Sequence, residues 1–173
     1  MDEARRTSVR ALCPRFDEVL AALGGPEGVS LHYAAGWDPE QGLEEQLGRS
    51  READREAGFT RLGPQRADLR IIARGRRASE IISRGQQKLV ACALLVAQGH
   101  QLESATSKRG VYLVDDLPAE LDAEHRYRLG RSLAGMKGQV MVTAVQRDLV
   151  LDGLAEAEEL TMFHVKHGRV TLQ

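Results

Sequence analysis

Two short apolar runs constrain the fold of this chain more than any other feature of its sequence. They are VYLV at residues 111–114 and QVMVTAV at residues 139–145, and a stretch of helical composition at about 123–133 lies between them. Neither run alternates strictly between apolar and polar residues, which is typical of parallel strands covered on both faces. Parallel strands need a crossover connection, which a helix usually supplies. The sequence therefore predicts an α/β fold with a parallel βαβ core.

The residues before this core are predicted to be mostly helical. A first helix is expected from residue 2 to about residue 23, with an interruption at Pro14. A half-exposed strand follows at residues 29–35, where apolar residues alternate with others. Asp38 is followed by a proline, which is a typical helix start, so a second helix is expected to run to about Glu56.

The character of the sequence changes at Gly58, where we place a domain boundary between residues 1–58 and residues 59–173. Beyond it, ADLRIIA alternates like a strand, RGRR indicates a turn, and a helix follows that is apolar nearly all round and hence buried. The final run MFHVKHGRVTL indicates a hairpin, because His167 and Gly168 can adopt the positive φ angles of a tight turn.

Charge is distributed unevenly along the chain, although the formal net charge is only -1. Between Arg61 and Lys88 there are eight basic and two acidic residues, so this window carries 8 - 2 = +6. Arg74, Arg76 and Arg77 lie at its turn and are candidates for contacts with the phosphates of DNA. The alternative is a set of solvated arginines on a hairpin. Aromatic residues make up 4% of the chain, which disfavours stacking on single-stranded bases as the main binding mode.

Cysteine and histidine usage gives no sign of disulfides or of a bound metal. Cys13 and Cys92 have no partner at metal-ligand spacing and are interpreted as reduced thiols, which indicates a cytoplasmic protein. His164 and His167 lack a third ligand nearby and are interpreted as structural. The longest apolar run, residues 89–97, is too short to span a bilayer, so no membrane partner is expected.

Two adjacent carboxylates, Asp115 and Asp116, directly follow the apolar run at 111–114. Ligands bind off the carboxyl ends of strands in open α/β sheets, so this pair is predicted to face a ligand. An apolar strand that ends in carboxylates is the Walker B arrangement, in which the first acid supports Mg²⁺ and the next orients or deprotonates water. The alternative is a solvated turn that caps the next helix through Asp122.

A second candidate site, SRGQQK at residues 83–88, stands directly before the buried helix. Ser83 and Gln86 form the S-x-x-Q pattern of a capping box, which is a structural role. A helix N-terminus that carries a serine hydroxyl, Arg84 and the side-chain-free Gly85 is also suited to bind a phosphate. The two roles are compatible.

Taken in order, SRGQQ, VYLVDD and AELD resemble the signature motif, Walker B motif and D-loop of ABC-type ATPase heads. The nearer resemblance is to the C-terminal half of the RecF family of DNA replication and repair proteins. The segments that carry it are GWD (36–38), the R-x-x-D-R-x-x-G-x-T run (51–60), LGPQRADLRI (62–71), SRGQQKLVACALLVAQG (83–99), VYLVDDLPAELDAEHR (111–126), QVMVTAV (139–145) and MFHVKHGRVT (162–171).

This resemblance implies a fold and a mechanism. Residues 59–173 would be the C-terminal lobe of an ABC/SMC-type P-loop ATPase head, and residues 1–58 would belong to the lid or arm domain. Two subunits would sandwich two nucleotides in an ATP-dependent homodimer. The residues with implied roles are Ser83, Arg84, Gly85, Gln86 and Gln87 at the γ-phosphate held by the opposite subunit, Asp115 at Mg²⁺, Asp116 as the catalytic base, and Glu120, Leu121 and Asp122 as the D-loop.

The resemblance further implies the biological setting, which is binding of ATP and of single-stranded or gapped DNA in recombinational repair and SOS induction, together with recombination mediator proteins. Two departures from the family pattern stand out. No GxxxxGK[ST] phosphate-binding loop occurs in residues 1–173, so the chain resembles a C-terminal half. Gln65 stands where the family pattern GPHR has histidine, which leaves any contact of that imidazole in question.

Three hypotheses about function follow from the sequence. In the first, the chain becomes an ATPase only with a P-loop-bearing half. In the second, it is a stand-alone module that binds DNA or a protein without ATPase activity. In the third, it is an inactive fragment from a truncated reading frame.

Overall fold

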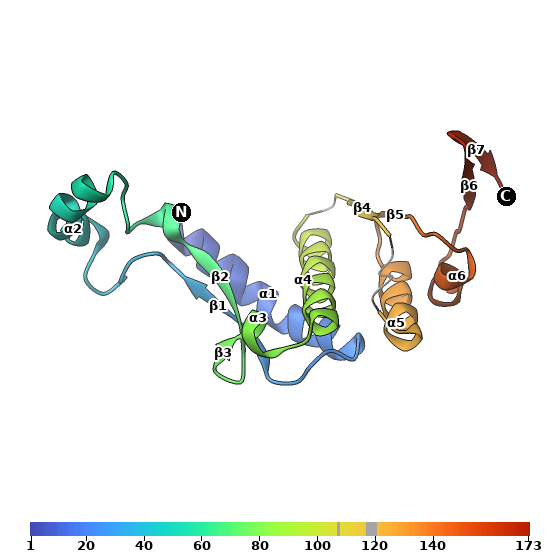
Figure 1. Cartoon of the computed structure of the whole chain (residues 1–173), viewed down its shortest axis with the longest axis horizontal. Helices are drawn as coiled ribbons and strands as arrows, with labels where there is room; N and C mark the ends of the chain where they lie inside the picture. Colours follow the sequence, from blue (N-terminus) through green and yellow to red (C-terminus); the bar gives the residue numbers. More distant parts are fainter. Residues whose placement is uncertain (107, 117–120) are drawn as a thin grey trace.

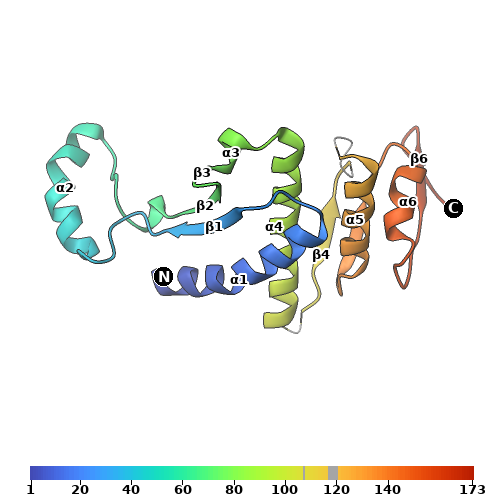
Figure 2. The same ribbon diagram turned by 90° about the horizontal axis from the view of Figure 1, so that it is seen from below.

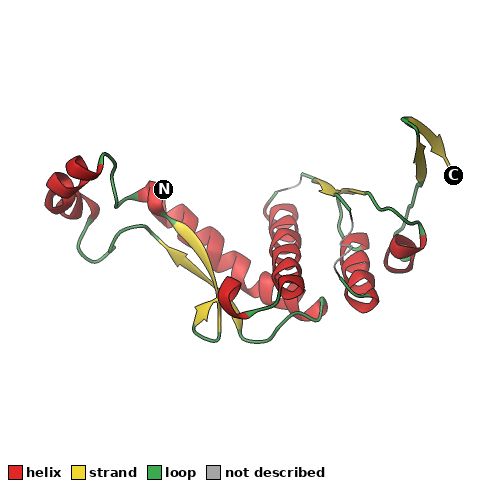
Figure 3. Ribbon diagram, in the orientation of Figure 1, coloured by secondary structure: helices red, strands yellow, loops and turns green. Residues whose placement is uncertain are grey.

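The structure, a computed structural model, describes residues 1–106, 108–116 and 121–173. The chain is elongated, with helix α2 at one end and the terminal hairpin at the other (Figure 1). Both helices and strands are distributed along its length (Figure 3). The helices are α1 (Asp2–Ala22), α2 (Leu43–Ala57), the 3₁₀ turn η1 (Pro64–Arg66), α3 (Ala78–Ile81), α4 (Arg84–Ala105), α5 (Ala123–Ala134) and α6 (Asp148–Leu154). The strands are β1 (Val29–Ala34), β2 (Asp68–Ala73), β3 (Arg76–Arg77), β4 (Val111–Val114), β5 (Gln139–Val142), β6 (Phe163–Lys166) and β7 (Arg169–Leu172).

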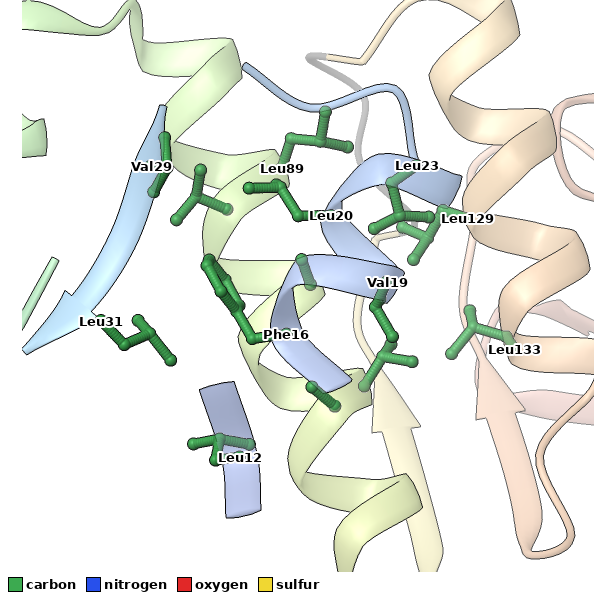
Figure 4. Packing of buried hydrophobic residues seen from close by; sticks show 14 of the residues in the cluster. Leu12, Phe16, Val19, Leu20, Leu23, Val29, Leu31, Leu89, Leu129 and Leu133 are labelled. Atoms are coloured by element: carbon green, nitrogen blue, oxygen red, sulfur yellow. The ribbon is translucent and has the colours of Figure 1, made fainter. Parts of the chain in front are cut away.

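The hydrophobic core forms where α1 crosses α4. Helix α1 buries one face, whose members recur three or four residues apart, and the fully buried Phe16 points from it toward α4 (Figure 4). On one side Val29 and Leu31 of β1 close the core, and on the other side Leu129 and Leu133 of α5 do so. Helix α4 is thus covered by α1, β1 and α5 along one face, but its Leu95 and Leu102 are 64% and 48% exposed. The prediction that this helix is buried nearly all round is therefore confirmed for one face only.

The first sheet is antiparallel with the order β1-β2-β3. Its long pair aligns Val29 with Ala73 and Ala34 with Asp68, and a tight turn at Arg74 and Gly75 leads into β3. The boundary predicted near Gly58 lies between β1 and β2 in the sequence. The sheet therefore joins residues from both predicted segments.

The second sheet is the predicted parallel pair, β4 and β5, with α5 as the crossover. Tyr112 and Val140 are among the residues on its inner face, which packs against the core. The outer face carries Val111, Leu113 and Met141, which are exposed, and Leu113 is 75% exposed. The prediction that apolar side chains of this sheet are covered on both faces is therefore wrong for the chain by itself.

The terminal hairpin has the predicted form. His167 and Gly168 both adopt positive φ angles, 50° and 73°, and join β6 to β7. One face of the hairpin is entirely apolar and exposed. Its members are Phe163, Val165, Val170 and Leu172, which pair across the two strands.

Two local predictions fail for identifiable reasons. Pro14 lies inside α1 without ending it, because the helix is held on both sides of the proline by its buried face. The second helix begins at Leu43 and not after Asp38. The Asp38 carboxylate instead accepts hydrogen bonds from the N–H of Glu40 and the side chain of Gln41, which closes a turn before the helix.

Within the described residues, no helix combines the length and apolar character needed to cross a membrane.

Candidate nucleotide-binding site

The N-terminal end of α4 is organised by a reciprocal capping box. The Ser83 hydroxyl oxygen accepts a hydrogen bond from the Gln86 N–H, and the Gln86 side chain accepts one from the Ser83 N–H. These bonds satisfy two of the donors that a helix start leaves open. Among the described residues, the N–H groups of Arg84 and Gly85 make no hydrogen bond and remain available. The capping box therefore leaves two backbone donors open, and open donors of this kind at a helix N-terminus can bind an anion.

The side chains around this helix start divide into two groups. Ser83, Arg84 and Gln86 are exposed, and the Ser83 hydroxyl still has its proton to donate because its oxygen acts as the cap acceptor. Gln87 points the other way, since its side-chain amide donates to the backbone carbonyls of Ser79 and Ile82. Gln87 therefore fixes the segment that precedes α4 and is engaged with protein atoms.

The carboxylate pair lies at the carboxyl end of β4, as predicted for a Walker B strand. Asp115 and Asp116 are both exposed, and Asp116 adopts a positive φ of 47°. The Thr143 hydroxyl, at the end of the neighbouring strand β5, donates to Oδ1 of Asp115 at 2.7 Å and accepts from the N–H of Asp116 at 2.8 Å. Among the described residues Oδ2 of Asp115 has no bonded partner, so one carboxylate oxygen remains available for a cation or its water.

Two of the three residues predicted for the D-loop, Leu121 and Asp122, have structural roles in the fold. Glu120 lies outside the described residues, and Leu121 is buried in the core. Asp122 caps α5, because its carboxylate accepts from the backbone N–H of His125 at 2.9 Å and contacts the His125 ring at 2.8 Å. The backbone hydrogen bond, followed by the contact with the ring, lowers the pKa of Asp122 below its ordinary value. The capping role proposed for Asp122 as the alternative is thus present.

The two candidate groups come from different elements, the start of α4 and the end of β4. Helix α4 and strand β4 run in opposite directions in Figure 2, so the α4 start and the end of β4 lie toward the same side in that view. No hydrogen bond or ion pair between described residues joins Ser83–Gln87 to the aspartate pair. No group of three or more metal-ligating side chains occurs within the described ranges either.

The basic turn between β2 and β3 exposes its three arginines. Arg74 occupies the left-handed region with a φ of 50°, and Arg76 forms an ion pair with Glu80 at 3.1 Å. Arg74 and Arg77 form no ion pair with any described residue. Two of the three predicted DNA contacts are therefore uncompensated charges.

Gln65, which stands where the family pattern has histidine, closes a local loop. Its side-chain amide donates to the carbonyl of Leu62 at 2.9 Å, and its side chain lies against Gly63, whose φ is 126°. This contact is structural.

Comparisons with known proteins show the family to which this chain belongs. Residues 39–171 match the family model described as RecF/RecN/SMC N terminal domain. This chain belongs to the RecF/RecN/SMC family. Relatives named DNA replication and repair protein RecF are 47% identical in Pseudomonas paraeruginosa and 48% identical in Pseudomonas aeruginosa, each over 171 residues and 99% of this chain. The chain spans 46% of the length of each. The resemblance to RecF is confirmed.

Solved structures of the RecF/RecN/SMC family share the fold. The recombination mediator protein RecF with ATP superposes with a TM-score of 0.69 at 22% identity, over 99% of this chain and 46% of that one. A structure from work on ATP-driven dimerisation and DNA-stimulated activation of SMC ATPases has a TM-score of 0.58 at 18% identity, over 100% of this chain and 88% of that one. At these identities the likeness confirms the predicted ATPase-head fold.

One feature of the site was missed by sequence analysis. The sequence predicts Thr143 only as part of a strand, although its hydroxyl contacts both members of the carboxylate pair. The available signal was its position, because the carboxyl ends of adjacent parallel strands meet at one edge of a sheet.

Proposed function

We propose that this chain supplies the signature motif and the Walker B strand of a RecF-type ATPase that acts on DNA. The observation that carries the proposal is the order of chemical groups along the fold. An open helix start at Ser83–Gln86 is followed by a carboxylate pair at the end of β4 and by a helix start at Asp122. This order matches that of the signature motif, Walker B motif and D-loop in the resemblance to RecF. The chain also belongs to the RecF/RecN/SMC family and shares the fold of RecF, which supports a nucleotide-binding role.

The start of α4 would contact the γ-phosphate of a nucleotide held by another subunit. The free N–H groups of Arg84 and Gly85 and the positive end of the helix dipole favour an anion there. The Ser83 hydroxyl proton and the Arg84 guanidinium add donors, and Gln87 would act indirectly by holding the preceding segment.

The end of β4 would serve the nucleotide bound by its own subunit. Asp115, with one oxygen open, would support Mg²⁺, whose chemistry when bound is to neutralise the charge of the phosphate oxygens. Asp116 would accept a proton from the attacking water. An aspartate in this role reaches less far than a glutamate, so we expect slow turnover, as suits a switch. Glu120, Leu121 and Asp122 would lie near the dimer interface.

A P-loop-bearing half is required because the phosphate cradle and its lysine are absent from residues 1–173. The exposed sheet faces support such a partner. Leu113 is 75% exposed and Phe163 is 59% exposed, and both belong to faces made entirely or mainly of apolar side chains. Contiguous apolar faces of this kind mark interaction surfaces. They favour this hypothesis over the stand-alone module and over the inactive fragment.

The biological setting follows from the same proposal. The complete assembly would bind ATP and single-stranded or gapped DNA in the cytoplasm, where Cys13 and Cys92 stay reduced, and would act with recombination mediator proteins in recombinational repair and SOS induction. Arg74 and Arg77, which carry uncompensated charge, are the proposed contacts to DNA phosphates, with Arg76 beside them.

The test is reconstitution. The P-loop-bearing N-terminal half that the resemblance implies is taken from the Pseudomonas aeruginosa relative and joined to this chain to give a reconstituted protein. We expect DNA-stimulated ATP turnover, which Arg84→Ala lowers at least tenfold. Arg10→Ala, an exposed arginine of α1, is the matched control and leaves turnover unchanged. A reconstituted protein that folds but turns over no ATP, or an Arg84→Ala variant as active as the control, contradicts the proposal.

A further inference from the structure

Thr143 joins the two strands of the parallel sheet at the edge where the carboxylate pair lies. Its backbone N–H donates to the carbonyl of Val114 at 2.9 Å, so it sits one residue beyond the last paired residue of β5. Its hydroxyl uses its proton on Oδ1 of Asp115 and a lone pair on the N–H of Asp116. The Thr143 hydroxyl therefore contacts both aspartates, as a donor to Asp115 and as an acceptor from Asp116, because a hydroxyl can act as both.

The two contacts control different properties of the pair. The bond to Oδ1 orients the Asp115 carboxylate and leaves Oδ2 as its open oxygen. The bond to the N–H of Asp116 holds a backbone conformation with a φ of 47°, which non-glycine residues rarely adopt and which is maintained only by surrounding contacts. A change in the backbone conformation of Asp116 would turn its carboxylate in another direction.

We propose that Thr143 is a positioning residue that sets the geometry of both carboxylates, holding Asp115 toward a divalent cation and Asp116 toward the attacking water. The inference rests on the proposed function and assigns Thr143 no contact with the substrate. Partners of a ligating carboxylate act in this way, and their loss typically lowers metal affinity about 10-fold to 100-fold.

Substitutions at Thr143 separate the hydroxyl from the shape of the side chain. Thr143→Val keeps the branched shape and removes both hydrogen bonds, whereas Thr143→Ser keeps the hydroxyl and removes a methyl group. The side chain is exposed and valine is favoured in strands, so the fold is retained. Thr143→Ala replaces the valine variant should its thermal unfolding differ from that of the wild type. Thr171→Val is the control, because it also removes a threonine hydroxyl that makes a hydrogen bond, here to the backbone carbonyl of His164 in the terminal hairpin and away from the carboxylate pair.

The first experiment uses this chain alone and does not depend on ATP turnover. Hydrogen exchange of the Asp116 amide is followed by NMR. We expect exchange about fivefold faster or more in Thr143→Val than in the wild type or Thr143→Ser, since an amide that loses its acceptor is exposed to water. Equal Asp116 exchange rates in all three proteins overturn the inference.

The second experiment measures ATP turnover of the reconstituted protein against Mg²⁺ concentration. Thr143→Val is expected to raise the Mg²⁺ concentration at half-maximal turnover about tenfold and to lower the maximal rate, whereas Thr143→Ser and Thr171→Val stay within about threefold of the wild type. A residue that only stabilised the fold would lower the thermal stability without shifting the Mg²⁺ requirement.

The outcomes separate this inference from the proposed function. Suppose that Asp115→Asn lowers turnover but Thr143→Val keeps the wild-type Mg²⁺ dependence. This result overturns the role of Thr143 and leaves the proposed function in place. A wild-type reconstituted protein without turnover contradicts the proposed function, and the amide-exchange result then decides the inference by itself.

Discussion

The contact between α5 and α6 gives a prediction whose sign can be worked out from the structure. Gly130 of α5 faces Gly153 of α6, and a Cβ added at Gly130 would lie 2.7 Å from the Cα of Gly153 and 2.8 Å from its carbonyl carbon. Ordinary carbon contacts are about 3.5–4.0 Å, so α6 would have to move by roughly 1 Å. Backbone atoms cannot rotate out of the way as a side chain can.

The magnitude follows from two opposed effects of Gly130→Ala. Overpacking of this kind costs about 1–3 kcal/mol, and a backbone neighbour places it near the upper value. Alanine in a helix interior recovers about 1 kcal/mol relative to glycine. We therefore expect a net loss of about 2 kcal/mol in the free energy of unfolding, which is about 4–8 °C in Tm for a chain of this size.

A matched glycine tests the same substitution without the contact. Gly48 lies inside α2 and has no atom within 4 Å of its added Cβ, so Gly48→Ala is expected to leave the free energy of unfolding unchanged or to raise it by up to about 1 kcal/mol. Urea unfolding followed by far-UV circular dichroism measures both variants. A Gly130→Ala variant as stable as Gly48→Ala would refute the packing of α5 on α6.

Further predictions concern the charged groups and the nucleotide. Arg74→Ala combined with Arg77→Ala should flatten the salt dependence of DNA binding by the reconstituted protein, while Arg10→Ala should keep the wild-type dependence. Fluorescence anisotropy from low to moderate salt measures this dependence, and an equal dependence in all variants would place the DNA elsewhere on the surface. The pKa of Asp122 is lowered in the folded state from its ordinary 3.8, so its charge contributes stability above that pH, and this contribution is lost as the pH falls through the folded pKa. Asp122→Asn should consequently be less stable than the wild type at pH 6, with the difference vanishing in acid; a constant difference across chemical denaturation curves from pH 6 to pH 2 would argue against it. This chain by itself should bind Mg-ATP weakly, and low-micromolar affinity in a calorimetric titration would show that a P-loop is unnecessary.

The parts of the fold that the sequence predicts are those in which a local pattern and the tertiary packing agree. The parallel pair β4 and β5 and the hairpin turn at His167–Gly168 occur where the pattern placed them. The capping box at Ser83 is also present, because its two partners are three residues apart and need no distant contact. The site motifs on these elements could be placed on the fold for the same reason.

The predictions from sequence fail where a distant or unusual contact determines the local structure. Gln46, a buried polar residue, accepts from the N–H of Asp38 and donates to its carbonyl, which holds the chain in a turn just where the Asp-Pro pattern predicts a helix start. Helix α6 went unpredicted because Arg147 precedes it without a side-chain cap. The role of Thr143 needs the register of two strands, which a single motif does not give.

Separate substitution of the two aspartates in the reconstituted protein tests whether the end of β4 is a Walker B site. Asp115→Asn should weaken Mg²⁺-dependent ATP binding, since an amide replaces a carboxylate poorly beside a divalent cation. Asp116→Asn should keep binding, slow turnover by about 10²-fold or more and trap an ATP-bound dimer, which size-exclusion chromatography detects. We expect the trapped dimer for Asp116→Asn and its absence for Asp115→Asn. Identical behaviour of the two variants, or a loss of thermal stability in both with unchanged ATP turnover, would contradict it.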